Sequence, residues 1–324
     1  MSDRASAGAP SPSGIVLVDK PQGWTSHDVV ARMRRLANTR KVGHAGTLDP
    51  MATGLLVIGI GSSTRLLTYV VGTDKEYLAT MRLGASTTTD DAEGEITERA
   101  SSDALSAVTM DRIGAGVAQL TGRIEQVPSA VSAIKVDGKR AYARVRGGED
   151  VQLDSRAVTV SAFDVLEIVR SDAGAVDVSV RIECSSGTYV RALARDLGAH
   201  LGVGGHLTAL RRTRVGPYRV TDAAALDGLD VAARLMSPAA AASALLGRVQ
   251  LTAQQAVDLG HGKLIAATDD VADGHPVAAI APDGRLIGLA EYRNGTGRAI
   301  VNFPADEVVP SAGGYADDGG GSKH

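Results

Sequence analysis

The sequence has a single cysteine, few aromatic residues and no long apolar run. Cys184 is the one cysteine in 324 residues, which excludes a disulfide framework and a thiolate metal cluster. The near absence of cysteine also indicates a reducing, cytoplasmic location. No stretch of about 18 apolar residues occurs, and the N-terminal MSDRASAGAPSPSG has no apolar h-region after its one arginine. We therefore expect neither a membrane span nor a secretory signal.

The common motifs of metal and nucleotide binding are also missing. The chain contains no HExxH, no GxxxxGK[ST] and no CxxC, and its acidic run DDAEGEITE lacks the ligand spacing of an EF-hand loop. GIGSST lacks the third glycine of a dinucleotide fingerprint. We predict no metal and no cofactor. As single histidines, His27, His44 and His206 are more typical of structural or surface positions than of catalytic ones.

The net charge of -3 hides three basic segments. They lie at 28–41, 123–146 and 206–219, and each holds far more lysine and arginine than acid. One such segment alone is usually a solvated face. Three together favour a polyanionic partner, because affinity for a phosphate backbone depends on local basic contacts and not on the charge of the whole protein.

The first structured segment is predicted to form a strand, a turn and a helix. Apolar residues recur at helical spacing from Val29 to Leu36, behind Ser26 as a candidate cap. Arg32 and Arg35 fall away from this apolar stripe. The helix should therefore bury one face and offer the other to solvent or phosphate.

Further strands are predicted at 54–61, 75–84 and 175–184, and the last alternates strictly between apolar and polar residues. Cys184 lies on its apolar side and is interpreted as a core residue. Helical periodicity follows at 190–201. Strands and helices alternate without a regular βαβ rhythm, so the sequence predicts an α+β fold with a mixed, largely antiparallel sheet.

The chain divides into a large domain and a small one. An alanine-rich connector at 221–247 ends the large domain, which we place at 14–247. Two turn signals then separate three short apolar runs, which predicts a small antiparallel β module at 248–304. The ends, 1–13 and 305–324, are predicted to be disordered.

One loop raises a question of chemistry. In GHAGTLDPMATGLL a single carboxylate, Asp49, precedes Pro50 among several glycines. Asp-Pro favours a turn, and glycines let the backbone fold tightly or approach another molecule closely. From this loop alone, Asp49 is equally well a turn residue or a catalytic carboxylate.

The loop resembles the signature of the tRNA pseudouridine synthase B family, whose members make pseudouridine-55 in the T-loop of tRNA. Five other segments resemble family motifs, and all occur in the order that the family has. They are the opening KPxGxTS segment DKPQGWTS, the tyrosine strand KEYLATMRLGASTTTDDAEGE, the basic insertion QVPSAVSAIKVDGKRAYARVRGGE, the arginine motif CSSGTYVRALARDLG and the pocket-closing segment GGHLTALRRTRVGPY. The resemblance covers residues 14–218, and the later module is faintly similar to the small PUA-like RNA-binding domain.

The resemblance implies roles for particular residues. Asp49 corresponds to the essential ionised carboxylate, and Arg191 to the arginine that holds it and lowers its pKa. Tyr77 corresponds to a tyrosine that stacks on a flipped uridine, and Tyr189 and Leu210 to pocket residues. His44 corresponds to a residue that fills the space left by the flipped base. Whether Asp49 attacks C1′ or C6 of the nucleotide or removes a sugar proton stays open.

The resemblance also implies a basic thumb insertion at 121–150 that closes over the T-arm. The residues predicted to contact the RNA backbone are Lys135, Lys139, Arg140, Arg144, Arg146, Arg211 and Arg212. The expected partner is tRNA, with no obligatory protein partner, and we expect a monomer.

Two other functions remain open at this point. The first is a tRNA-binding or remodelling protein, a folding chaperone whose isomerase activity is secondary or absent. The second is a uracil-base glycosidase, which the sequence favours less because glycoside hydrolysis ordinarily uses two carboxylates and the loop offers one.

Overall fold

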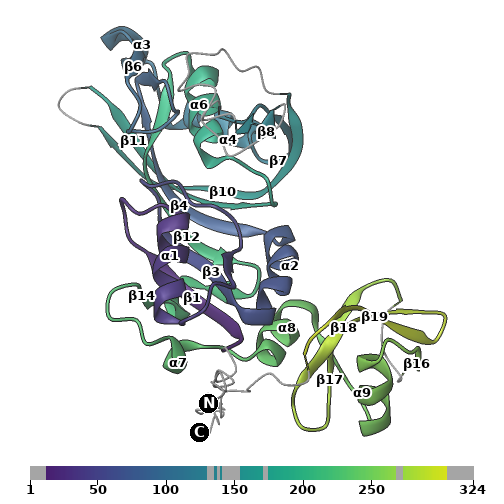
Figure 1. The fold of residues 1–324 in the computed structure, drawn as a ribbon. Coiled ribbons are helices and arrows are strands. Elements are labelled where there is room, and N and C mark those ends of the chain that lie inside the picture. Colours follow the sequence, from purple (N-terminus) through teal and green to yellow (C-terminus); the bar gives the residue numbers. More distant parts are fainter. Residues whose placement is uncertain are drawn as a thin grey trace, which may run out of the picture.

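A computed structural model describes residues 12–129, 135–136, 139–140, 154–170, 174–267 and 273–304, with the backbone alone at 135–136 and 139–140. The main body is built on a sheet of ten described strands, ordered β14-β1-β3-β12-β4-β11-β10-β7, with β13 paired to β12 and β2 to β3 (Figure 1). Only the pairs β1–β14 and β3–β12 are parallel among these described strands. The predicted α+β fold with a mixed, largely antiparallel sheet is confirmed.

The strands of this sheet are β1 (Gly14–Lys20), β2 (Val42–His44), β3 (Thr53–Ile60), β4 (Lys75–Leu83), β7 (Gly122–Gln126), β10 (Arg156–Arg170), β11 (Val176–Cys184), β12 (Gly205–Val215), β13 (Tyr218–Arg219) and β14 (Ala224–Ala225). The helices of the body are α1 (Ser26–Leu36), α2 (Leu67–Gly72), α3 (Ser102–Ser106), α4 (Met110–Gln119), α6 (Val190–Leu201), α7 (Val231–Arg234) and α8 (Pro238–Leu246), with short 3-10 turns at Gly61–Leu66 and Val220–Asp222. Two small hairpins pair β5 (Ala85–Thr87) with β6 (Ile96–Arg99) and β8 (Lys135–Val136) with β9 (Lys139–Arg140).

The β1 end of the sheet is buried on both faces. Val16 and Val18 point into a core with α1, whereas Ile15 and Leu17 point into a core with α2 and α8. A third core lies between α4, α6 and the strands β4, β11 and β10. Alternate residues of one strand therefore serve different cores, as the twofold side-chain period of a strand requires.

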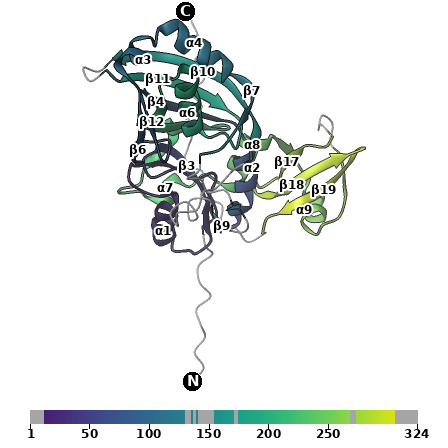
Figure 2. The same ribbon diagram turned by 90° about the horizontal axis from the view of Figure 1, so that it is seen from above.

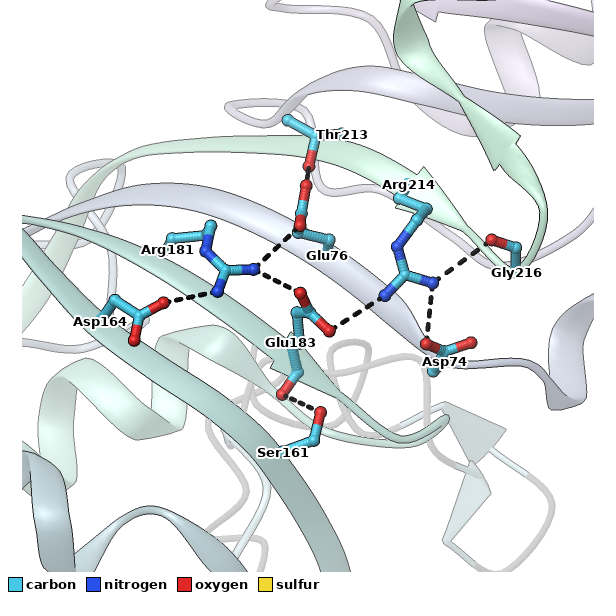
Figure 3. Close-up of polar contacts among 9 residues, drawn as sticks. All are labelled: Asp74, Glu76, Ser161, Asp164, Arg181, Glu183, Thr213, Arg214 and Gly216. Carbon is cyan, nitrogen blue, oxygen red and sulfur yellow. Dashed lines mark hydrogen bonds and ion pairs between the residues drawn. The ribbon is translucent and has the colours of Figure 1, made fainter.

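The strands β4 and β11 match the sequence prediction residue by residue. Tyr77 and Ala79 are buried, while Leu78 between them is 40% exposed. The alternation of β11 is complete, and Cys184 at its end is a buried, free thiol, as predicted. The opposite, more exposed face of these strands carries a network of ion pairs centred on Arg181 and Arg214 (Figure 3).

The small C-terminal module is a second sheet, ordered β15-β17-β18-β19-β16, with one helix. Its elements are β15 (Arg248–Gln250), α9 (Ala253–Gly260), β16 (Ile265–Ala266), β17 (Pro276–Ile280), β18 (Leu286–Arg293) and β19 (Thr296–Asn302). The predicted antiparallel strands are β17, β18 and β19. The module lies beside α8 and α2 in both views (Figures 1 and 2), and Ile280, Leu289 and Phe303 share a core with Leu55 and Val57 of β3.

Three local details differ from the sequence prediction. Thr25, not Ser26, caps α1, in a capping box with Asp28. Ser13 is buried and hydrogen-bonds to Ser62, so the N-terminal segment is ordered before residue 14. The start of the predicted insertion, β7, is a strand of the main sheet paired with β10. No helix in the described part of the chain is long and apolar enough to cross a membrane.

Candidate active site

The loop that carries Asp49 is held by the turn between β1 and α1. The Ser26 hydroxyl accepts a hydrogen bond from the Leu48 N–H at 2.9 Å and donates to the Leu48 carbonyl at 3.2 Å. On the other side of Asp49, the Gly23 N–H donates to the Pro50 carbonyl at 2.8 Å. Because Leu48 and Pro50, the residues on either side of Asp49, are both hydrogen-bonded, the backbone of Asp49 has little conformational freedom.

Lys20 lies beneath this loop with its side chain fully buried. Its ammonium donates to the carbonyls of Trp24 at 2.7 Å, Pro21 at 3.0 Å and Pro50 at 3.4 Å. Burial lowers the pKa of Lys20 to about 8, and the Asp49 carboxylate opposes that shift. The lysine thus fastens the turn to the loop and adds positive potential below Asp49.

Arg212 holds the back of the same loop. Its guanidinium donates to the carbonyls of Leu55 at 2.8 Å and Gly46 at 3.1 Å. Gly54 is needed where β3 passes β12: its φ is +99°, and a Cβ there would lie 2.3 Å from the Arg212 carbonyl oxygen. Gly54 therefore permits the backbones of β3 and β12 to pair closely behind the site.

Asp49 and Arg191 form a bidentate pair. The Arg191 Nε lies 3.0 Å from Asp49 Oδ2, and its Nη2 lies 3.4 Å from Oδ1. The guanidinium is buried at 5% exposure, whereas the carboxylate keeps 35% of its surface open. Arg191 Nη1 donates to the Thr89 carbonyl at 2.8 Å and lies 3.6 Å from the buried Asp91 carboxylate. These contacts orient the arginine, and only the Asp49 side of the pair faces outward.

The net pKa shift of Asp49 runs opposite to the sequence expectation. Burial raises the pKa of the carboxyl, and Asp91 adds to the rise. Arg191 does lower this pKa, as the resemblance implied, but by less than burial raises it. The pKa of Asp49 therefore lies above its ordinary value. Arg191 partly offsets the penalty of burying a charge, so that a carboxylate can exist in this position.

The open side of Asp49 faces a cavity of about 300 Å³. Tyr77, Tyr189 and Leu210 all line it, as do Asp49 and Arg191. Tyr77 and Leu210, both largely buried, give the cavity apolar surface, and the remaining lining is mixed, with Thr47 and Lys75 among its polar members. A cavity of this size that combines apolar and aromatic surface with polar groups suits a small planar ligand beside an anchored carboxylate.

The segment between β11 and α6 forms another part of the cavity wall. Ser185, Ser186, Gly187 and Thr188 line it, and Tyr189 follows as the residue before α6. The backbone N–H of Tyr189 donates to the Gln126 side chain of β7 at 2.8 Å. The sheet strand β7 therefore fixes the end of this wall.

Some predicted site residues lie elsewhere. His44 is not among the described residues that line this cavity; it sits in β2, and its ring meets that of His27 edge-on at 5.7 Å. Arg211 is paired with Asp19 at 2.7 Å and is 40% exposed. Arg212, in contrast, does line the cavity, but it is 1% exposed and donates to two carbonyls, which argues against the RNA-backbone contact predicted for it.

The thumb residues can be placed only in part. Lys135, Lys139 and Arg140 lie in the paired strands β8 and β9, where the backbone alone is described. Arg144 and Arg146 lie outside the described residues.

Sequence reasoning missed Asp91 and Ser26 as parts of the site. Asp91 completes the surroundings of Arg191, and its carboxylate also accepts from the Thr89 hydroxyl at 2.5 Å and the Glu93 N–H at 3.1 Å. The acidic run TTTDDAEGE contains this residue, but nothing in its spacing distinguishes one carboxylate from the next. Ser26 suits a helix cap equally well, because serine is common there.

Known proteins match along almost the whole chain. A family model described as the N-terminal domain of TruB family pseudouridylate synthase matches residues 34–190, and one described as the C-terminal domain of tRNA pseudouridine synthase II matches residues 246–304. The tRNA pseudouridine synthase B of Leifsonia xyli is 66% identical over 298 residues, covering 92% of this chain and 98% of the relative. The chain belongs to the TruB family of pseudouridylate synthases.

Two further comparisons agree with the family. The tRNA pseudouridine synthase B of Arthrobacter sp. strain FB24 is 58% identical over 92% of this chain and 99% of the relative. Among solved structures, a chain of an H/ACA RNP bound to a substrate RNA containing 2'-deoxyuridine is 25% identical, with a TM-score of 0.67 over 90% of this chain and 86% of that one. The main sheet described above is therefore that of a TruB family member.

Proposed function

We propose that this chain is a tRNA pseudouridine-55 synthase, which isomerises the T-loop uridine of tRNA to pseudouridine. The observation that carries the proposal is the Asp49–Arg191 pair, which opens into a cavity walled by Tyr77 and Leu210. Relatives as much as 66% identical over 92% of the chain bear the name tRNA pseudouridine synthase B, which supports the choice of substrate.

The reaction needs no second reactant. The N1–C1′ glycosidic bond breaks, the uracil turns within the site, and C5 bonds to C1′. C5 then loses its proton to solvent and N1 gains one, so substrate and product have the same mass. A carboxylate, an arginine and a shaped cavity are sufficient for such an isomerisation, because nothing is oxidised, added or hydrolysed.

In this proposal the cavity receives a uridine that has left the base stack. Extruding a base costs a few kcal/mol, and stacking on an aromatic ring returns about 1 to 3 kcal/mol. Tyr77 supplies the stacking surface, Leu210 the opposite apolar wall, and Tyr189 the rim. Asp49 presents the ionised carboxylate to the reacting nucleotide, and Arg191 sets its direction.

The tRNA backbone would lie along the basic segments around this cavity. Arg156 already lies over the Tyr189 ring at 5.9 Å, beside the cavity rim. The C-terminal module would extend the same surface. Clustered lysine and arginine favour RNA, so the thumb residues are proposed as phosphate contacts, namely Lys135, Lys139, Arg140, Arg144 and Arg146.

The proposal is tested with T-arm RNA that carries tritium at C5 of the target uridine. Wild-type protein should release tritium and give a product of unchanged mass. Asp49→Asn should abolish release while RNA binding persists, because the substitution keeps the size of the side chain but removes its ionisable carboxyl group.

Two outcomes would contradict the proposal. If wild-type protein binds the RNA but releases no tritium, the chain is an RNA-binding or remodelling protein. If free uracil appears, the chain is a glycosidase. Leu78→Ala is a suitable control variant, since Leu78 is next to Tyr77 but lies on the opposite face of β4.

A further inference from the structure

Trp24 is the one tryptophan of the sequence, and it is not buried. It is 37% exposed, although a tryptophan is ordinarily a residue of cores and interfaces. It occupies an unspecified position of the KPxGxTS motif, so the resemblance to the family assigns it no role. Its backbone carbonyl holds Lys20 at 2.7 Å, which leaves the indole as the part without an assignment.

The indole lies between two hollows on the outer side of α1. One, of about 370 Å³, is lined by Pro21, Trp24, Arg32, Arg35, Leu226 and Asp227. The other, of about 360 Å³, is lined by Gly23, Trp24, Asp28, Ala31 and Arg35. Trp24 and Arg35 line both hollows, so an aromatic ring and a guanidinium border each of them.

Arg32 and Arg35 are available to a ligand. Neither guanidinium forms an ion pair or a hydrogen bond with any residue in the described part of the chain. The Asp28 carboxylate in the second hollow is engaged by the N–H and hydroxyl of Thr25 at 3.0 and 2.6 Å. Asp227 is the other acid that lines the hollows. The patch thus combines an exposed ring with two guanidinium groups that are open to a phosphate.

This patch is connected to the active site through one residue. Gly23, next to Trp24, donates its N–H to the Pro50 carbonyl at 2.8 Å, and Pro50 follows Asp49. One hydrogen bond therefore joins the turn that carries the indole to the loop that carries the carboxylate, and α1 follows directly from that turn (Figure 1). The turn that carries Trp24 and the loop that carries Asp49 are therefore in direct contact.

We infer that Trp24, Arg32 and Arg35 form a second nucleotide-binding site, which stacks one unpaired base of the same tRNA outside the cavity and contacts its phosphates. The pairing of an aromatic face with arginines is the usual chemistry of single-stranded nucleic-acid contacts. This inference rests on the proposed function for the identity of the RNA.

The single tryptophan makes the test direct. Fluorescence excited at wavelengths that tyrosine does not absorb reports on Trp24 alone. We expect addition of unmodified tRNA to Asp49→Asn protein to quench this emission, because a base stacked on the indole quenches it. Parallel titrations with the isolated T-arm hairpin and with perfectly paired duplex RNA follow the same emission. Quenching by the hairpin places the stacked base in the T-arm, and quenching by whole tRNA alone places it elsewhere in the tRNA.

Variants give a second readout. Trp24→Ala should weaken tRNA binding by about 5- to 150-fold, and Trp24→Phe should restore part of the affinity. Arg32→Gln with Arg35→Gln should reduce the slope of log K against log salt by about one for each phosphate that the variant no longer neutralises. Arg99→Gln, an exposed arginine of β6, is the matched control and should leave the slope unchanged.

Tritium release by wild-type protein, measured beside the quenching of Asp49→Asn protein, separates the two proposals. Release without quenching, together with normal binding by Trp24→Ala, would overturn the second site alone. Absence of both release and tRNA binding would overturn the proposed function and this inference with it. Equal quenching by duplex RNA would show that the ring senses general electrostatic binding and not a stacked base, which also contradicts the inference.

Discussion

The two faces of β4 carry arginine–carboxylate clusters of opposite character. On one face Glu76 joins a network in which Arg181 contacts three carboxylates, those of Glu76, Asp164 and Glu183 (Figure 3). On the other face Tyr77 borders the cavity in which Arg191 holds Asp49. Adjacent residues of one strand thus belong to a surface network and to a candidate active site.

The difference lies in which effect dominates the pKa, hydrogen bonding for Glu76 and desolvation for Asp49, and not in the presence of an arginine. A hydrogen bond from Thr213 and the nearby Arg181 hold the pKa of Glu76 below its usual value. Burial raises the pKa of Asp49, although its arginine is as close. A carboxylate whose two oxygens are both held by neighbours, as those of Glu76 are, is structural, whereas one that is paired on one side and open to a cavity on the other is suited to react.

The largest expected effect comes from removing the arginine of the site. Arg191→Gln should lower kcat/KM for tritium release by about 100- to 1,000-fold, because the carboxylate loses its orienting cation in a water-poor site. Single-turnover kinetics measure the loss. Arg195→Gln, on the same helix but paired with Asp90 and Asp196, is the control. Equal losses in both variants would contradict a special role for Arg191.

The pH dependence of the reaction should report the ionisation of Asp49. The active form of Asp49 is ionised, so kcat/KM should rise with pH through a pKa above the ordinary carboxyl value, by about tenfold per pH unit on the acid side. Since Arg191 lowers that pKa, Arg191→Gln should move the acid limb to higher pH. The profile of tritium release against pH measures both. A limb that stays in place, or moves to lower pH, would refute this account.

A smaller effect is expected when the hydrogen bond that supports the Asp49 loop is removed. Ser26→Ala leaves the buried Leu48 N–H without its hydrogen bond, which should reduce kcat/KM about tenfold and destabilise the fold by about 1 to 3 kcal/mol. Thr25→Ala, which removes the helix cap next to it, should cost about 1 kcal/mol of stability with little change in rate. Urea titration and tritium release separate the two effects. The same rate in both variants would mean that the loop does not depend on Ser26.

The smallest effect should come from the surface network. Glu76→Gln should leave kcat/KM within about twofold and lower Tm by roughly 2 to 4 °C, because one carboxylate in a partly exposed network contributes little. Thermal unfolding and tritium release test this on one sample. A large fall in rate with unchanged Tm would show that the two faces of β4 are coupled.

Much of the local structure could be predicted from the sequence. The alternation of β4 and β11, the apolar stripe of α1 and the turns between β17, β18 and β19 all depend on side chains a few positions apart. Boundaries and caps are harder to predict. Thr25 and Ser26 are both good caps, and only the position of Leu48 decides that Ser26 serves the loop instead.

The site itself shows the same division. A family resemblance was needed to associate Asp49 with Arg191, since no local pattern relates residues 142 positions apart. The burial of Arg212 could not be predicted from the sequence either, because an arginine in a basic segment is ordinarily exposed on the protein surface.

By itself, the sequence determined the periodicity of the strands and helices and the one carboxylate of the loop, because these depend on neighbours along the chain. The tertiary structure decided which carboxylate Arg191 reaches, and that burial outweighs that arginine in the pKa of Asp49. Desolvation depends on everything packed around a group, and most of what surrounds Asp49 comes from distant parts of the chain.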